Sequence, residues 1–111
     1  MIAAKVTLQN ANTGYTLLEL IQAVYGTGTN IVQPRASSIT IQYLGSDDGY
    51  IVPNAGPYAE TGNVPDQFGY SFANSGTYWE KVSDHNQFAL QEIILGAQTD
   101  GDTFAVTVYY T

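Results

Sequence analysis

The sequence predicts an all-β protein: a compact antiparallel β-sandwich or jelly-roll-like barrel of about seven strands, in a single domain spanning residues 1–111. Short runs of alternating apolar and polar residues recur along the chain. Gly, Asn, Asp and Pro separate these runs at short intervals, and only one segment has helical spacing. Because strands follow one another without alternating helices, a sandwich or barrel is favoured over an α/β layout.

The first two elements have different periodicities. Apolar residues alternate with others along residues 2–9, which predicts a strand. Apolar residues then recur at helical spacing over residues 17–25. Thr16 and Glu19 stand in the relation of a capping box, and Gly26 is placed to end the element. We therefore expect one short helix near residues 17–25, which must pack on a sheet because nine residues are too few for a stable isolated helix.

The middle of the chain predicts a strand pair followed by a long loop. Residues 39–43 alternate as a strand, and residues 45–49 have the composition of a turn. We expect residues 50–52 to return as the second arm of a hairpin, which Pro53 ends. Residues 53–67 are rich in Pro, Gly, Asn and Ala. A loop of this length usually carries a function or is disordered.

Further strands are expected in the C-terminal half. Residues 68–73 and 77–82 predict two short strands around an Asn-Ser-Gly turn. Residues 88–95 predict another strand, followed by a turn at 96–101. The alternation is clearest in the final strand, at residues 102–110, where Phe, Val, Val and Tyr share one parity.

Composition limits the partners that the chain can have. The net charge is −7, and the only cations are Lys5, Arg35 and Lys81. Three scattered cations cannot form the basic stripe that binds nucleic acid or an anionic membrane, so we expect neither partner. Only 12% of the residues are charged, about half the usual share. A polar, uncharged surface rich in aromatic residues is typical of protein–protein contact.

The chain also lacks several kinds of chemistry and sorting signal. It has no cysteine, which excludes disulfides, thiolate catalysis and cysteine-based zinc sites. It has no basic segment leading into an apolar run, and no apolar run near the roughly 20 residues of a membrane span. We therefore expect a soluble chain that is used as it is made.

Few residues are candidates for catalysis or metal binding. His85 is the only histidine and follows Asp84 in a string of turn formers, so an exposed turn is favoured over a catalytic triad. We expect no enzymatic activity, no catalytic residues and no cofactor. Turn geometry also accounts for the acidic residues of two turns, which lack the ligand pattern of an EF-hand. The sequence leaves open whether these turn carboxylates bind calcium: Asp47, Asp48, Asp100 and Asp102.

Aromatic residues are the strongest candidates for an interaction site. Aromatic rings on strands can form a protein interface, stack on sugars or pack in the core. Six of them could form a common platform: Tyr43, Tyr50, Tyr58, Tyr70, Tyr78 and Trp79. We predict that the loop at residues 53–67 faces a partner, together with Tyr58, Tyr70, Tyr78 and Trp79.

Four stretches together resemble small β-rich virion proteins of tailed bacteriophages. They are VTLQNANTGYTLL at residues 6–18, SITIQ at 38–42, EIILG at 92–96 and VTVYY at 106–110. Chains of that kind begin with a Val-Thr strand and an Asn-Thr-x-Tyr-x-Leu stretch, pass through a hydrophobe-Thr-Ile-Gln strand, and end in a glycine-turn hairpin with paired tyrosines. The likeness covers about half of the chain.

The resemblance implies a decoration, cement or other auxiliary structural protein on the capsid surface of the virion. The expected partners are then the major capsid protein or another virion protein, and further copies of this chain. The sequence departs from the pattern at residues 46–87, where a long insertion rich in Tyr and Pro replaces a short turn-and-loop section. That insertion is a candidate contact surface. Two alternatives remain open: a carbohydrate-binding module or host-glycan adhesin, and a tail or baseplate subunit.

Overall fold

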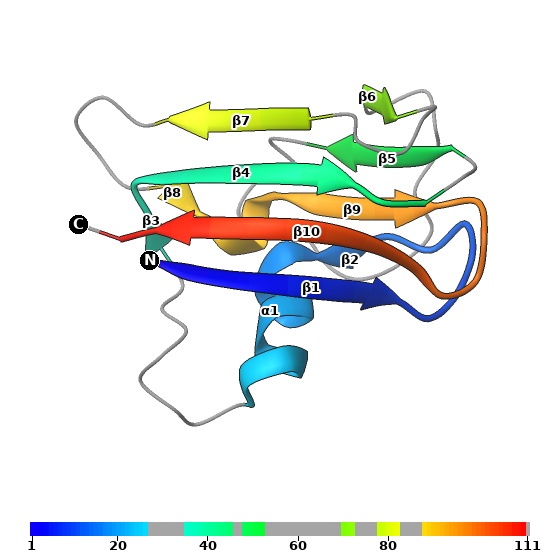
Figure 1. Cartoon of the computed structure of the whole chain (residues 1–111), viewed down its shortest axis with the longest axis horizontal. Coiled ribbons are helices and arrows are strands. Elements are labelled where there is room, and N and C mark those ends of the chain that lie inside the picture. Colours follow the sequence, from blue (N-terminus) through cyan, green and yellow to red (C-terminus); the bar gives the residue numbers. More distant parts are fainter. Residues whose placement is uncertain (27–34, 46–47, 53–69, 73–77, 83–87, 111) are drawn as a thin grey trace.

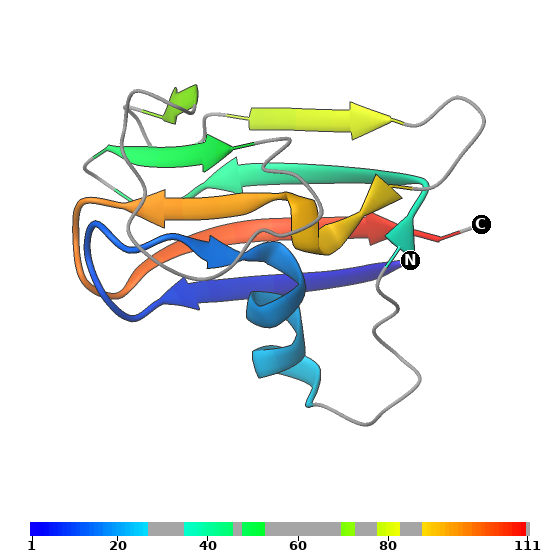
Figure 2. The same cartoon turned by 180° about the vertical axis from the view of Figure 1, so that it is seen from behind.

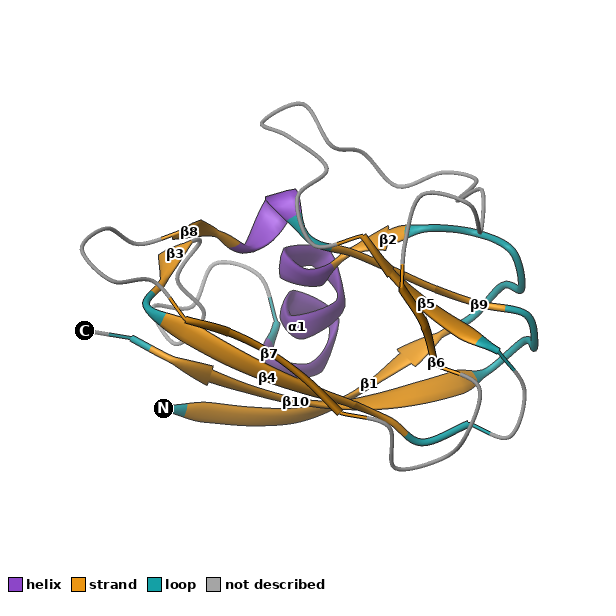
Figure 3. Cartoon of the chain, turned by 90° about the horizontal axis from the view of Figure 1, so that it is seen from above, coloured by secondary structure: helices purple, strands orange, loops and turns teal. Residues whose placement is uncertain are grey.

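The computed structural model describes residues 1–26, 35–45, 48–52, 70–72, 78–82 and 88–110, with the backbone alone at 70–72 and 78. These residues form a two-layered antiparallel β-sandwich with one α-helix (Figures 1 and 3). In chain order the elements are β1 (Ile2–Leu8), β2 (Tyr15–Thr16), α1 (Leu17–Tyr25), β3 (Arg35–Ala36), β4 (Ser38–Tyr43), β5 (Gly49–Val52), β6 (Tyr70–Phe72), β7 (Tyr78–Val82), β8 (Phe88–Ala89), the 3-10 turn η2 (Leu90–Glu92), β9 (Ile94–Ala97) and β10 (Asp102–Tyr109).

The strand order is that of a jelly roll. The first sheet has the order β1-β10-β4-β7 and the second has the order β2-β9-β5-β6, while β3 and β8 form a separate two-stranded ladder. When β3 and β8 are left out and the other eight strands are renumbered along the chain, the sheets read 1-8-3-6 and 2-7-4-5. In this arrangement the chain winds repeatedly from one sheet to the other. The predicted all-β sandwich is confirmed.

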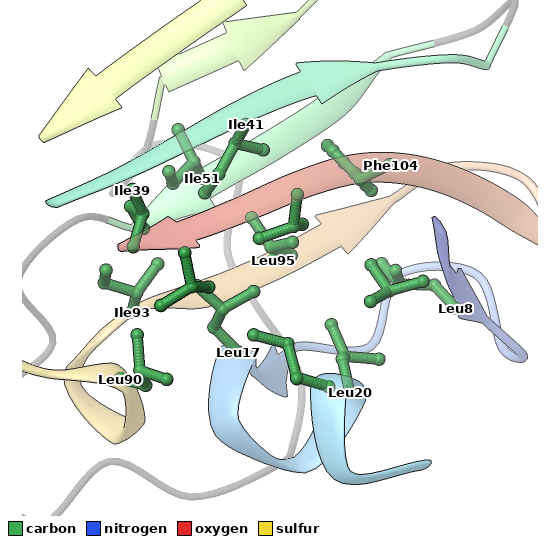
Figure 4. Close-up of a cluster of buried hydrophobic side chains, with 14 of the residues drawn as sticks. Leu8, Leu17, Leu20, Ile39, Ile41, Ile51, Leu90, Ile93, Leu95 and Phe104 are labelled. Carbon is green, nitrogen blue, oxygen red and sulfur yellow. The ribbon is translucent and has the colours of Figure 1, made fainter. Parts of the chain in front are cut away.

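The core lies between the two sheets and under the helix, as Figure 4 shows for several of its side chains. Strands β1, β4 and β10 bury alternate residues, because successive side chains of a strand point to opposite faces. The apolar parity predicted for the final strand is therefore the buried one. The largest fully buried side chains form one cluster: Tyr43, Phe104, Leu8, Leu17, Ile21, Ile39, Ile41, Ile51, Leu90, Ile93, Leu95 and Val6.

The helix α1 has the bounds and caps that the sequence predicts. The Thr16 side chain accepts a hydrogen bond from the Glu19 amide at 3.3 Å, and Gly26, with φ +88°, donates its amide to the Gln22 carbonyl at 2.7 Å. The helix buries its apolar stripe beside β1 and η2, over the inner face of the first sheet (Figure 3). Packing rather than length therefore stabilises it. Within the described part of the chain, no helix has the length and apolar character that a membrane span requires.

The predicted hairpin between residues 39–43 and 50–52 is wrong. β5 forms where it was expected, but it pairs with β6 and β9 in the second sheet, whereas β4 pairs with β7 and β10 in the first. The turn composition at residues 45–49 thus marks a crossing between the sheets. Turn residues show that the chain changes direction, but they do not determine which strand it pairs with next.

The prediction for residues 88–95 and 96–101 needs a similar correction. This stretch is divided into β8, η2 and β9, and β9 extends to Ala97. Residues 93–95 are all buried, so this part of the chain has no single outward face. The glycine turn does not close a hairpin either, because β9 pairs with β2 and β5 while β10 pairs with β1 and β4.

The backbone at Gly45 and Gly49, on either side of the change from the first sheet to the second, lies close to the buried ring of Tyr43. Its hydroxyl donates a hydrogen bond to Asp102 Oδ2 at 2.7 Å, and its ring centroid lies 5.2 Å from that of Phe104. Glycines allow the backbone to approach this ring closely. A Cβ at Gly49 would lie 2.8 Å from two Tyr43 ring carbons, and a Cβ at Gly45 would lie 2.6 Å from the Asp102 carboxylate.

We predict that Gly49→Ala lowers the free energy of unfolding by about 1–3 kcal/mol, because overpacking a fixed ring forces a shift of the core. The added methyl would also lie 3.0 Å from the Phe104 ring. Phe104→Leu makes room beside it, so the double variant should lose less stability than the sum of the two single losses. Urea unfolding measures all three variants, and additive losses would contradict this packing.

Candidate functional site

The structure brings three of the four predicted contact residues to one side of the sandwich. Tyr70 lies in β6, an edge strand of the second sheet, while Tyr78 and Trp79 lie in β7, an edge strand of the first. Both strands lie on the side opposite α1 (Figures 1 and 2). Tyr58 and the loop at residues 53–67 lie outside the described residues.

Trp79 contributes to the core as well as to this side. It stands opposite Ile41 in the pairing of β4 with β7, and therefore shares the inward parity of that buried residue. Its side chain is half-buried and packs against the core cluster. The partner-facing role predicted for Trp79 stays a prediction, and its side chain also contributes to the packing of the core.

Two of the six aromatic residues considered as a platform are core residues. Tyr43 is fully buried and Tyr50 is 5% exposed. The Tyr50 hydroxyl accepts a hydrogen bond from the Gln98 side-chain amide at 2.6 Å, which ties β5 to the segment after β9. These rings cannot stack on a sugar from their observed positions, so a platform of all six aromatic residues is wrong.

The described acidic turn residues accept hydrogen bonds within the chain, two of them through their carboxylates. Asp100 Oδ1 accepts a hydrogen bond from the Ala11 amide at 2.6 Å, and Asp102 binds the Tyr43 hydroxyl. The backbone carbonyl of Asp48 accepts a hydrogen bond from the Gln98 amide at 3.0 Å. Among the residues described, no group of three or more His, Cys, Asp or Glu side chains could hold a metal ion. Asp47 and His85 lie outside the described residues.

A small pocket lies between β1 and α1. It has a volume of about 150 Å³ and is lined by Thr7, Gln9, Tyr15, Glu19, Leu20 and Ala23. Ligand pockets usually measure about 300–1,000 Å³, so this one is too small for a typical ligand. Its lining contains no nucleophile with an adjacent histidine base.

All three cations of the chain lie on strands at sheet edges. Lys5 is at the centre of β1, Arg35 is in the two-stranded ladder, and Lys81 is in β7. The Lys81 ammonium lies 4.8 Å from the centroid of the Phe88 ring, in a cation–π contact. Charged residues on edge strands, and inward-pointing ones above all, prevent pairing with the edge of another sheet. The few cations thus occupy places where they oppose strand-to-strand aggregation.

Sequence reasoning missed the outward face of the first sheet, because its members come from four separate segments. Alternation within each strand indicates the polar parity, but only the strand register places these residues side by side. We call this outward surface of the first sheet the outer face. Its described side chains are Ala3, Lys5, Thr7, Ser38, Thr40, Gln42, Glu80, Val82, Thr103, Ala105, Thr107 and Tyr109.

Comparison with protein-family models, curated proteins and solved structures found no match for this chain. The resemblance to phage virion proteins therefore gains no support from these comparisons.

We predict that Trp79→Ala lowers the free energy of unfolding by about 1–3 kcal/mol. The loss should be smaller than for a fully buried tryptophan, because only part of the Trp79 indole is packed against the core. Glu80→Ala is the matched control. Its side chain is the exposed neighbour on the same strand, and we expect a change within about 0.5 kcal/mol. Equal stability of the two variants in urea unfolding would contradict the packing of Trp79 against the core.

Proposed function

We propose that the protein is a non-enzymatic structural virion protein: a capsid decoration or cement protein that binds the shell of a tailed bacteriophage at repeated sites. The main support is the jelly-roll strand order, an architecture that viral capsid proteins share with lectins and cupins. One architecture serves many functions, so this support is an analogy of fold. The resemblance of the four sequence stretches adds to it.

The surface chemistry suits contact with protein, either another copy of the chain or the shell. The outer face consists mainly of Thr, Ala and Ser, with only Lys5 and Glu80 charged among its described side chains. Such a surface can be covered by protein without removing many charges from water. A shell offers many equivalent positions, and linked binding events increase the overall affinity when each single contact is weak.

The charge distribution suits a protein that is made free and assembles later. A net charge of −7 favours the solubility of free copies before assembly. The cations on the edge strands oppose uncontrolled growth by strand addition. The faces and loops of the sandwich then remain as the contact surfaces.

Binding to a host glycan is the second candidate, because lectins also use the jelly roll. In this case the sugar site would be lined by Tyr58, Tyr70, Tyr78 and Trp79. The buried Tyr43 and Tyr50 would not take part. A glycan array separates the two functions: the decoration protein should bind capsid shells and no glycan. A tail or baseplate subunit would instead bind tails rather than shells.

We predict that Tyr58→Ala weakens binding to capsid shells about tenfold or more, because tyrosine is enriched among the residues that dominate interface energies. The assay mixes purified protein with shells stripped of it and measures the copies that pellet with them. Binding should saturate at a number set by the equivalent positions of the icosahedral shell. Wild-type protein that stays in the supernatant would contradict the function.

Val24→Ala is the control for the site. Val24 is 48% exposed on α1, on the side opposite β6 and β7. We expect this variant to bind shells as wild type does. Melting temperatures should be measured in parallel, because a loss of binding by Tyr58→Ala counts only if the fold is retained. Equal binding by both variants would contradict the role of Tyr58.

A further inference from the structure

We infer that the outer face binds a second copy of this chain, forming a two-fold symmetric dimer in which two first sheets pack face to face. This inference does not rest on the proposed function, because it concerns the isolated protein. It depends on the order of the side chains across the face, which the strand register fixes.

Exposed apolar side chains gather at one end of this face. Tyr109 stands opposite Ser38, and Ser38 stands opposite Val82, so the three form one row across β10, β4 and β7. Tyr109 is 41% exposed and Val82 is 61% exposed. Met1, 76% exposed, precedes the pair formed by Ile2 and Val108, and so extends the same row. Three of the four large hydrophobic side chains exposed in the described part of the chain thus share this row.

The rest of the face carries mostly small side chains and few charges. The next row is Ala3, Thr107, Thr40 and Glu80, and the row after it contains Lys5, Ala105 and Gln42. Small side chains at the centre allow another sheet to approach to the usual stacking distance of about 10 Å. Contact then covers β-branched and small side chains rather than long charged ones.

The two charges make the face complementary to itself. Lys5 and Glu80 are both exposed, carry opposite charges, and lie on opposite edge strands in neighbouring rows. Consider a two-fold axis that lies in the interface and runs parallel to the strands. It places the edge strand β1 of each copy over the edge strand β7 of the other. It places Lys5 of each copy beside Glu80 of the other, and brings Val82 over the end of the partner's β1. Such reciprocal contact is the property of a two-fold interface.

Edge-to-edge pairing of two β1 strands is the competing dimer. Lys5 is the central residue of Ile2–Leu8, so antiparallel pairing centred on it would place two ammonium groups directly opposite each other. Like charges in that position are destabilising. The face is therefore favoured over the edge as the site of self-association.

The size of the face predicts a weak dimer. Four strands about 4.8 Å apart and seven residues long cover roughly 450 Å², so a pair of faces covers roughly 900 Å². That is the low end for specific interfaces, where association is weak and transient. We expect monomers at low micromolar concentration and dimers at several hundred micromolar.

Charge exchange tests the arrangement. Sedimentation equilibrium of the wild type should show a monomer–dimer equilibrium. Lys5→Glu alone and Glu80→Lys alone should each weaken dimerisation about tenfold or more. Each single variant turns both Lys5–Glu80 contacts of the symmetric dimer into contacts between like charges. The double variant Lys5→Glu/Glu80→Lys should restore dimerisation to within a few-fold of the wild type. The two residues are three strands apart, roughly 14 Å, so they are too distant to pair within one copy.

Two further variants separate the alternatives. Val24→Glu adds a negative charge to α1, away from the outer face, and should leave the equilibrium unchanged. Lys5→Ala removes the charge from the centre of β1, and should strengthen association if the edge is used but weaken it if the face is used.

Three results would overturn the inference: a wild type that is monomeric at every concentration, single charge variants that dimerise normally, or a double variant no better than the single ones. A monomeric chain whose binding to capsid shells is lost in Lys5→Glu would assign the face to the shell, and would also contradict the dimer.

Discussion

The packing around the buried ring of Tyr43 is the constraint that accompanies the change from the first sheet to the second. The ring is held by a hydrogen bond to Asp102 and by contact with Phe104, both in the strand beside β4. Because the backbone passes close to the ring, glycine is needed at positions 45 and 49. β4 belongs to the first sheet, and β5 lies in the second sheet between β6 and β9.

This crossing determines which strands are neighbours, and therefore which side chains share an outward surface. Since β4 does not pair with β5, the first sheet takes β10 and β7 as the neighbours of β4. The outer face consists of residues from β1, β10, β4 and β7 in this order. The edge strands β6 and β7 lie on the same side of the sandwich (Figure 1). Charged residues on the edges oppose strand addition, so the contacts that we propose lie on the outer face and on the side that carries Trp79. A capsid-bound dimer would use both surfaces at once.

Local patterns in the sequence predicted the elements, but not which strands would pair. Alternation gave β1, β4 and β10, and the caps of α1 were predicted because capping bonds join residues three or four apart. The hairpin of β4 with β5 was predicted wrongly, since a turn between two sheets has the same composition as a turn within one sheet. The inward parity of Trp79 and the burial of Tyr50 depend on partner strands far along the chain. The outer face was missed for the same reason.

The most direct test of this account is a measurement of strand neighbours by nuclear Overhauser effects in the labelled protein. The jelly-roll order predicts cross-strand contacts between the backbones of Thr40 and Thr107, and between those of Ile51 and Leu95. It also predicts no ladder of such contacts between β4 and β5, because these strands belong to different sheets. A continuous series of backbone contacts between β4 and β5 would show a hairpin and contradict the crossing at Tyr43.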